Sequence, residues 1–345
     1  MVPDRQRQWR VAARPVGRAL ADSDFTLAEA PVARPGEGEV LLRTLYLEFA
    51  PAQKSWMENL AGYRDPIEIG DVMTGNGSAV VLESRHPDFA AGDLVTGLIG
   101  WSEYPVVAGA KLARVAQGIS PTAALSTLGT SGRTAYAGLV LVGEPKPGDV
   151  LLVSGAAGAV GTLVGQIGKI AGCTVIGIAG GAEKCRWLVE EVGFDGAIDY
   201  RAEKLRSRLR ELAPKGVDIF YDNVGGEILN EALTRIAPGA RVVICGAIAR
   251  YNHDPRDASQ MPEGPRNYFN LVANGARMQG FIVYQFAHRF AEIDRRLAGW
   301  LRSGALTPHE DIAQGFERAP ATLRRLFEGA NVGKQLLKVA DIADA

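Results

Sequence analysis

Hydrophobic residues in the first third of the chain occur in short runs interrupted by glycine and proline, a pattern that predicts strands. The runs span 40–47, 77–84 and 93–99, and Pro35-Gly36 and Gly100 are among the residues that bound them. Short strands without a helical pattern between them are typical of an all-β module. We therefore expect a β-rich domain at the start of the chain.

From Thr127 onward, helical and strand patterns alternate, which predicts a doubly wound parallel sheet of the α/β class. A helix over 132–141 precedes the strand 150–153, the helix 159–171 and the strand 174–178. The further expected elements are the strands 218–222, 241–246 and 278–283 and the helix 226–236.

The tail carries helical patterns over 289–301 and 319–327 and a last strand over 334–339. We expect it to rejoin the N-terminal module, because these segments lie outside the predicted parallel sheet. A chain of 345 residues exceeds what one hydrophobic core usually holds. The expected domains are therefore 1–126 with 297–345, and 127–296.

Charge and composition favour small-molecule chemistry. The formal net charge is −1, with 38 basic and 39 acidic side chains, so no net attraction to nucleic acid or to an anionic membrane is expected. No apolar run reaches the ~20 residues that cross a bilayer. Three scattered cysteines argue against a disulfide framework, and the N-terminus has no apolar signal region. A cytoplasmic protein without membrane or nucleic-acid partners is expected.

A glycine-spaced turn between the strand 150–153 and the helix 159–171 predicts a pyrophosphate site. Gly155, Gly158 and Gly161 have the spacing that lets the backbone turn, approach phosphate and pack a helix closely. The helix N-terminus would direct amide groups at the anion. The spacing is G-x-x-G-x-x-G rather than G-x-G-x-x-G, so an ordinary glycine-rich helix start is the alternative; the complete βαβ context favours the dinucleotide site.

Six motifs in register resemble the medium-chain dehydrogenase/reductase superfamily over nearly the whole chain. Within it, the chain resembles the zinc-free alkenal/one reductases, including the prostaglandin reductases and the plant double-bond reductases. The motifs are 129–138 (GTSGRTAYAG), 156–161 (AAGAVG), 221–226 (YDNVGG), 244–248 (ICGAI) with Tyr251-Asn252, 280–284 (GFIVY) and 331–334 (NVGK). The segment 50–54 (APAQK) departs from the family pattern, which bears on the pocket wall and the substrate range.

The resemblance implies a Rossmann domain that binds NADP, a GroES-like β-rich substrate domain, an enal or enone substrate, and a homodimer. With the glycine turn, it implies cofactor contacts at Gly155, Gly158, Ala159, Val160, Gly161, Lys184, Tyr200, Asn223, Cys245, Gly246, Ala247, Ile248, Phe281, Ile282, Val283 and Asn331. A dimer is also favoured because the strand 278–283 would be an apolar sheet edge.

Charge at the end of the second sheet strand favours NADP over NAD. An NAD site places an acidic residue about twenty residues beyond the turn, whereas 178–181 reads Ile-Ala-Gly-Gly. The resemblance implies that Lys184 and Tyr200 hold the 2′-phosphate. The alternatives are a solvated lysine beside Glu183 and a tyrosine that merely ends a strand.

The three cysteines and four histidines provide neither a structural nor a catalytic zinc set, so no metal is expected. Hydrogen bonds must then stabilise developing oxyanion charge, which suits reduction of an activated C=C bond.

Tyr251 is the candidate catalytic donor; a loop anchor or a ribose contact is the alternative. His253 lies in a polar run that predicts an exposed loop. The segment from there to about 270 is predicted to cover the substrate.

The resulting hypothesis is an NADPH-dependent, zinc-independent reductase that adds hydride to the β-carbon of α,β-unsaturated aldehydes or ketones. Two alternatives stay open: an NADPH-dependent quinone reductase, and a crystallin-like protein that binds NADPH without turnover.

Overall fold

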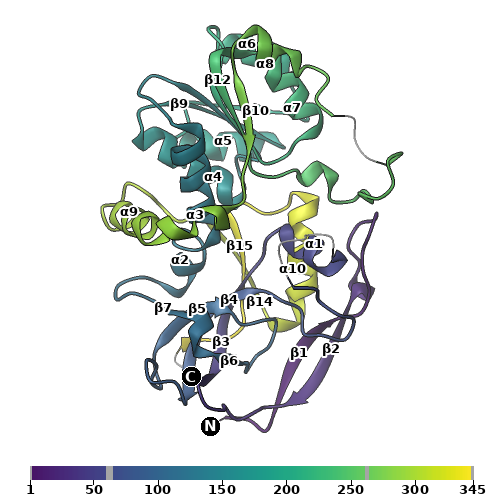
Figure 1. The fold of residues 1–345 in the computed structure, drawn as a ribbon, viewed down its shortest axis with the longest axis vertical. Coiled ribbons are helices and arrows are strands. Elements are labelled where there is room, and N and C mark those ends of the chain that lie inside the picture. The colour runs from purple at the N-terminus through teal and green to yellow at the C-terminus, as the bar shows by residue number, and fades with distance from the viewer. Residues whose placement is uncertain (1, 60–64, 261–263, 343–345) are drawn as a thin grey trace. The chain divides into compact units, whose positions relative to one another are not determined.

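The computed structural model describes residues 2–59, 65–260 and 264–342, and the chain divides into two compact units (Figure 1). Unit 1 comprises 1–126 and 310–345, and unit 2 comprises 127–309. The boundary expected at 297 is therefore wrong: it falls inside helix α9 (Phe290–Arg302), all of which belongs to unit 2. Helix α9 packs Ile293 and Leu297 into the core of that unit, which explains its place there.

Unit 1 is built on a mainly antiparallel sheet with the order β14-β15-β3-β4-β5-β7, to which β6 adds beside β3. The tail strands β14 and β15 pair with each other in parallel, and β15 pairs with β3. A separate antiparallel pair, β1-β2, was not predicted from the sequence. The elements are β1 (Arg5–Val11), β2 (Phe25–Pro31), β3 (Glu39–Glu48), α1 (Ala52–Glu58), β4 (Asn76–Ser84), β5 (Leu94–Leu98), β6 (Val106–Ala108), β7 (Leu112–Arg114), α2 (Pro121–Leu125), β14 (Glu310–Gln314), α10 (Ala319–Glu328) and β15 (Lys334–Lys338).

Unit 2 contains a parallel sheet with the order β10-β9-β8-β11-β12-β13 and helices on both faces. Chain order reverses between β8 and β11, and open sheets of this kind bind ligands at the carboxyl ends of the strands at such a point. The elements are α3 (Thr130–Tyr136), the π-helical η3 (Ala137–Gly143), β8 (Val150–Ser154), α4 (Ala159–Ile170), β9 (Thr174–Ala179), α5 (Ala182–Glu190), β10 (Gly196–Asp199), α6 (Leu205–Leu212), β11 (Val217–Asp222), α7 (Gly226–Leu233), β12 (Ile236–Ile244), η4 (Ile248–Arg250), α8 (Phe269–Ala273), β13 (Arg277–Gly280), η5 (Val283–Arg289) and α9.

Alternation along the central strands explains why their sequences are apolar throughout. On β8, Leu151 and Val153 pack into the hydrophobic cluster that includes α4 and α5, while Leu152 packs into the cluster that includes α6 and α7. Strand β11 repeats the pattern, with Phe220 on the second face. Successive side chains of a strand point to opposite faces, so a sheet covered on both faces needs apolar residues at every position.

Candidate nucleotide-binding site

The turn after β8 has the backbone conformation that its glycine spacing predicts. Gly155 adopts a φ of 57°, in the left-handed region that favours glycine. Gly158 donates its N–H to the Gly155 carbonyl at 3.0 Å and is the N-cap of α4. Ala159, Val160 and Gly161 form the first turn of this helix. Amide groups in a first helical turn have no intrahelical acceptor, so they are suited to an anion.

Gly161 is the position where no other residue fits. A Cβ there would lie 2.4 Å from the Gly155 carbonyl oxygen and 2.7 Å from Ala156 Cα. Both atoms belong to the backbone, so a side chain would push the helix away from the turn. The third glycine therefore sets the close packing of α4 against the turn, as a dinucleotide site requires.

A buried carboxylate, Asp222 at the end of β11, organises the neighbouring strand ends. Ser154 donates its hydroxyl to Asp222 Oδ1 at 2.6 Å, and the N–H groups of Val224 and Gly225 donate to the same oxygen at 3.0 Å. Gly225 also donates to Oδ2 at 3.1 Å. Burial raises the pKa of Asp222, and these hydrogen bonds oppose that shift. The residue was not predicted from the sequence, although it stands inside the YDNVGG motif.

Around Asp222, four of the predicted cofactor-binding residues come together. Asn223 donates Nδ2–H to the Ser154 carbonyl at 2.7 Å and accepts the Ile248 N–H at 3.3 Å on its own carbonyl. Cys245 and Gly246 donate their N–H groups to the Asp222 carbonyl at 2.9 and 3.1 Å. The loops after β11 and β12 are thus joined at the carboxyl edge of the sheet, and Ala247 follows in the same loop.

The thiol of Cys245 is a core group. Burial raises its pKa to about 12, and it lies beside Tyr221, whose hydroxyl donates to the Thr134 carbonyl at 3.1 Å. Phe281 packs beside Tyr221 over Gly138, where a Cβ would lie 2.5 Å from both the Phe281 ring and the Tyr221 hydroxyl oxygen. The predicted strand 278–283 ends at Gly280, so Phe281 and its successors follow β13 rather than belong to it.

The two residues after Phe281 differ in exposure. Ile282 is exposed, whereas Val283 is buried at the start of η5. Of this segment, therefore, Ile282 is the side chain most open to a ligand.

Lys184 and Tyr200 follow neighbouring strands, β9 and β10. Lys184 is half-buried in the first turn of α5, and Tyr200 is exposed directly after β10. Gly180 and Gly181 directly follow β9, where an NAD site carries an acidic residue. Glu183 is exposed one residue before Lys184. The local charge is consistent with a phosphate ligand.

Comparison with known proteins assigns the chain to a family. An N-terminal domain of oxidoreductase matches residues 7–115, and a domain described as zinc-binding dehydrogenase matches residues 159–299. An NADPH-dependent curcumin reductase of Escherichia coli is 41% identical over 342 residues, covering 97% of each chain. The NADP(+)-dependent 2-alkenal reductase of Nicotiana tabacum is 38% identical and covers 88% of each. The chain belongs to the zinc-free medium-chain dehydrogenase/reductases. The resemblance inferred from the six motifs is confirmed.

Solved structures agree with this family. The crystal structure of CurA from Vibrio vulnificus in complex with NADPH has a TM-score of 0.89 and 37% identity, covering 97% of this chain and 99% of that one. The α/β class with a parallel Rossmann sheet and an antiparallel sheet domain is thereby confirmed. The chain is an oxidoreductase of the medium-chain dehydrogenase/reductase family.

Tyr251, the predicted donor, directly follows η4 and donates its N–H to the Ile248 carbonyl at 3.2 Å. Its side chain is half-buried. His253 lies in a loop, as expected, but it is half-buried rather than exposed, and its buried Nδ1 has no hydrogen-bond partner among the described residues.

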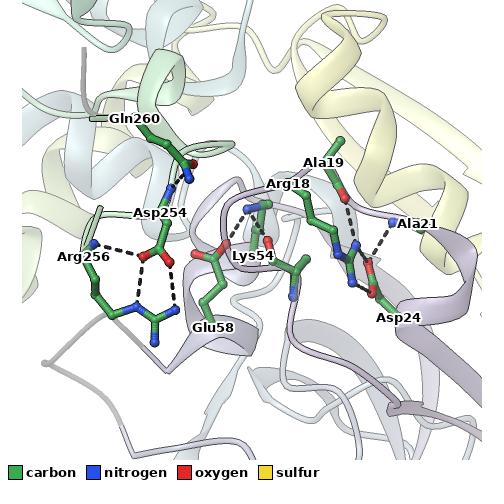
Figure 2. Close-up of polar contacts among 10 residues, drawn as sticks. Arg18, Ala19, Ala21, Asp24, Lys54, Glu58, Asp254, Arg256 and Gln260 are labelled. Atoms are coloured by element: carbon green, nitrogen blue, oxygen red, sulfur yellow. Dashed lines mark hydrogen bonds and ion pairs between the residues drawn. The ribbon is translucent and has the colours of Figure 1, made fainter. Parts of the chain in front are cut away.

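The loop that follows is held by its own hydrogen bonds. Asp254 accepts Nε and Nη2 of Arg256, both at 2.9 Å, and its N–H donates to Gln260 at 3.2 Å (Figure 2). Residues 261–263 of the predicted substrate-covering segment lie outside the described part of the chain.

Asn331, the remaining predicted cofactor residue, lies in unit 1. It is buried and donates Nδ2–H to the Gly333 carbonyl at 2.9 Å. The following Lys334 is also buried, paired with Glu48 at 3.0 Å. Both side chains are therefore held by polar contacts within unit 1.

The segment 50–54, which departs from the family pattern, has a structural role in unit 1. Lys54 in α1 is fully buried, donates to the Pro15 carbonyl at 3.0 Å and pairs with Glu58 one turn later (Figure 2). The contact ties α1 to the segment before β2, where Arg18 pairs with buried Asp24.

Among the described residues, no three His, Cys, Asp or Glu side chains are grouped so that they could hold a metal ion. Within the same residues, no helix has the length and apolar character needed to cross a membrane.

Proposed function

We propose that this oxidoreductase reduces the activated C=C bond of α,β-unsaturated aldehydes or ketones with NADPH. The observation that carries the proposal is the relationship over 97% of each chain to a curcumin reductase, supported by the alkenal reductase and by a prostaglandin reductase of Bos taurus that is 37% identical. Curcumin and 2-alkenals share a C=C bond conjugated to a carbonyl group. The substrate of this chain is therefore assigned to that chemical class.

The cofactor is NADPH, and the residues of unit 2 fit it. The first turn of α4 receives the pyrophosphate, and the close packing at Gly161 brings this turn to the strand end. The Asp222 carbonyl holds the loop 245–248, and Ser154 holds Asn223. Phe281, Ile282 and Val283 contact the nicotinamide.

The preference for NADPH over NADH tests the cofactor assignment. Lys184→Ala should lower NADPH affinity roughly 10- to 100-fold, because a hydrogen bond to a charged group contributes ~1.5–3 kcal/mol, while NADH binding changes little. Lys215→Ala is the matched control: Lys215 is an exposed lysine that precedes β11, at the opposite end of that strand from Asp222. Equal losses for both cofactors would remove Lys184 from phosphate binding.

When bound, NADPH supplies a hydride to the β-carbon of the enone. The carbonyl oxygen then gains negative charge, and Tyr251 donates a hydrogen bond to it from an uncharged hydroxyl. This interaction is stronger in the transition state than in the ground state, so it acts on turnover. Protonation of the enolate follows, from Tyr251 or from solvent.

The variant Tyr251→Phe distinguishes hydrogen-bond donation to the enone oxygen from a contact that only positions the cofactor ribose. Loss of an oxyanion donor can cost 10²–10³ in kcat, but water can replace a phenol in part, so a loss of about tenfold is expected with little change in KM for the enone. If Tyr251 only contacts the ribose, NADPH binding weakens and kcat at saturation stays unchanged. That result would remove Tyr251 from the chemistry.

The substrate class is tested by steady-state NADPH consumption with a panel of enals, enones and quinones. Selective turnover of enals and enones supports the proposal. Turnover of quinones alone would establish the quinone reductase alternative. NADPH binding without turnover of any compound would establish the crystallin-like alternative.

The assembly proposed is a homodimer that pairs at β13. This strand is the edge of the parallel sheet, and the neighbouring α8 exposes apolar side chains, with Tyr268, Phe269 and Val272 each more than 60% exposed. Exposed strand edges and contiguous apolar surface favour association. The proposed location is the cytoplasm, on the basis of the scattered cysteines.

A further inference from the structure

The acidic residue at the end of β10, Asp199, accepts hydrogen bonds from backbone N–H groups. Asp199 is buried, and its Oδ1 accepts the N–H groups of Gly181 at 2.9 Å and of Arg201 at 3.0 Å. These bonds tie the glycine pair after β9 to the start of the loop after β10. Asp199 therefore fixes the position from which Tyr200 and Arg201 extend.

Gly180 has no side chain, so the side chains of Tyr200 and Arg201 can pack directly against its backbone. A Cβ on Gly180 would lie 2.8 Å from Arg201 Nε and 2.9 Å from Tyr200 Cε1. The guanidinium carbon of Arg201 lies 5.8 Å from the centre of the Tyr200 ring. The guanidinium is thus placed beside Gly180 and the Tyr200 ring, although it is exposed to solvent.

We propose that Arg201 binds the 2′-phosphate of NADPH and is a determinant of cofactor choice. The inference rests on the proposed NADPH function. The end of the second strand of a βαβ nucleotide site is where the adenosine ribose is recognised. A planar guanidinium can donate two parallel hydrogen bonds to a phosphate, which an ammonium group cannot do. Tyr200 acts here by orienting Arg201, and Lys184 adds charge from α5.

Calorimetric binding of two nucleotide fragments tests the assignment without catalysis. Adenosine 2′,5′-bisphosphate and adenosine 5′-monophosphate differ only by the 2′-phosphate. Arg201→Gln should weaken the bisphosphate roughly tenfold, as expected for one exposed charge-assisted contact, and leave the monophosphate unchanged. The salt dependence of bisphosphate binding should also become shallower. Arg206→Gln, which removes another exposed arginine from α6, is the matched control and should change neither affinity.

Gly180→Ala provides a second perturbation that keeps every charge. The added methyl group must displace Arg201 and Tyr200, and both are side chains that can move, so folding should be unaffected by circular dichroism. The bisphosphate affinity should fall in the same direction as in Arg201→Gln.

The outcomes separate this inference from the proposed function. Wild-type protein that binds both fragments equally would overturn the NADPH assignment and the role of Arg201 with it. Wild-type preference for the bisphosphate that persists unchanged in Arg201→Gln would overturn the role of Arg201 alone. Loss of the preference in Arg201→Gln and in Gly180→Ala, with Arg206→Gln like wild type, supports the assignment.

Discussion

Replacing Asp222 by asparagine removes the buried carboxylate that accepts hydrogen bonds from the end of β8 and from the loop after β11. The asparagine carbonyl can take the place of one carboxylate oxygen and still accept from Ser154 and Val224. Its amide group then faces the Gly225 N–H, so the bond to Oδ2 at 3.1 Å is lost and two donors oppose each other, while the bond of the same N–H to Oδ1 at 3.0 Å remains. A hydrogen bond to a charged group is worth ~1.5–3 kcal/mol, and relief from burying a charge offsets part of its loss. We expect a net destabilisation of about 2 kcal/mol.

Urea unfolding followed by tryptophan fluorescence measures this loss, and NADPH titration measures its effect on the site. NADPH affinity should fall as well, because the Asn223 N–H donates to the Ser154 hydroxyl, which itself donates to the Asp222 carboxylate. Asp218→Asn on the same strand is the control, since that carboxylate accepts one backbone N–H, from Val150 at 2.8 Å. A variant within ~0.5 kcal/mol of wild type, the usual range for neutral substitutions, with normal NADPH affinity would refute the reasoning.

The same substitution has a pH signature. Burial raises the pKa of Asp222, so the folded state holds this proton more tightly than the unfolded state. The resulting stabilisation is complete below the unfolded pKa and is lost as pH rises through the folded pKa. Asparagine does not titrate. The difference in stability between wild type and Asp222→Asn should therefore narrow as pH rises through that window.

Three further predictions concern metal, thiols and assembly. Activity should survive dialysis against a chelator, because neither the sequence nor the described residues provide a zinc-ligand set; stoichiometric zinc whose removal abolishes activity would contradict this. Iodoacetamide at neutral pH should modify the half-buried Cys185 slowly in the native protein, because burial raises its pKa to about 11 and the thiolate is the reactive form; rapid native-state labelling would refute it. Light scattering at micromolar concentration should give a dimer, and Phe269→Asp on exposed α8 should shift it toward monomer, whereas a wild-type monomer would exclude the proposed pairing.

Elements with strong local signals were predictable from the sequence. The strands β8, β9 and β11 are apolar on both faces, and the glycine turn fixes where α4 begins. The pair β1-β2 was missed because its positions alternate weakly: β1 (RQRQWRV) buries only Gln6 and Val11 among its residues. The boundary at 310 was missed because the amphipathic pattern of α9 shows that it packs against a core without showing which one. The amphipathic pattern of a helix does not show which hydrophobic core the helix packs against.

The sequence showed that no acidic residue stands at the end of β9, but it did not show what the acidic residues at other strand ends do. The absence of an acid at the end of β9 is readable from the letters 178–181. The sequence does not show that Asp199 and Asp222 accept hydrogen bonds from backbone N–H groups. Both stand at strand ends, where a carboxylate could equally bind a ribose hydroxyl. The structure shows which donors these carboxylates accept: Oδ1 of Asp199 accepts two N–H groups, and Oδ1 of Asp222 accepts three donors. A carboxylate oxygen that already accepts two or three donors gains little from a further one.

Cofactor choice therefore depends on which charges remain available at the strand ends. With Asp199 directed at the backbone and glycine at 180 and 181, the groups that extend at this edge are the Tyr200 ring and the Arg201 guanidinium. No acidic residue stands at 178–181 to accept a hydrogen bond from a 2′-hydroxyl, and a 2′-phosphate would find a cation already oriented. The preference for NADPH over NADH would then follow as much from the glycine pair and the backbone contacts of Asp199 as from the presence of Lys184 and Arg201.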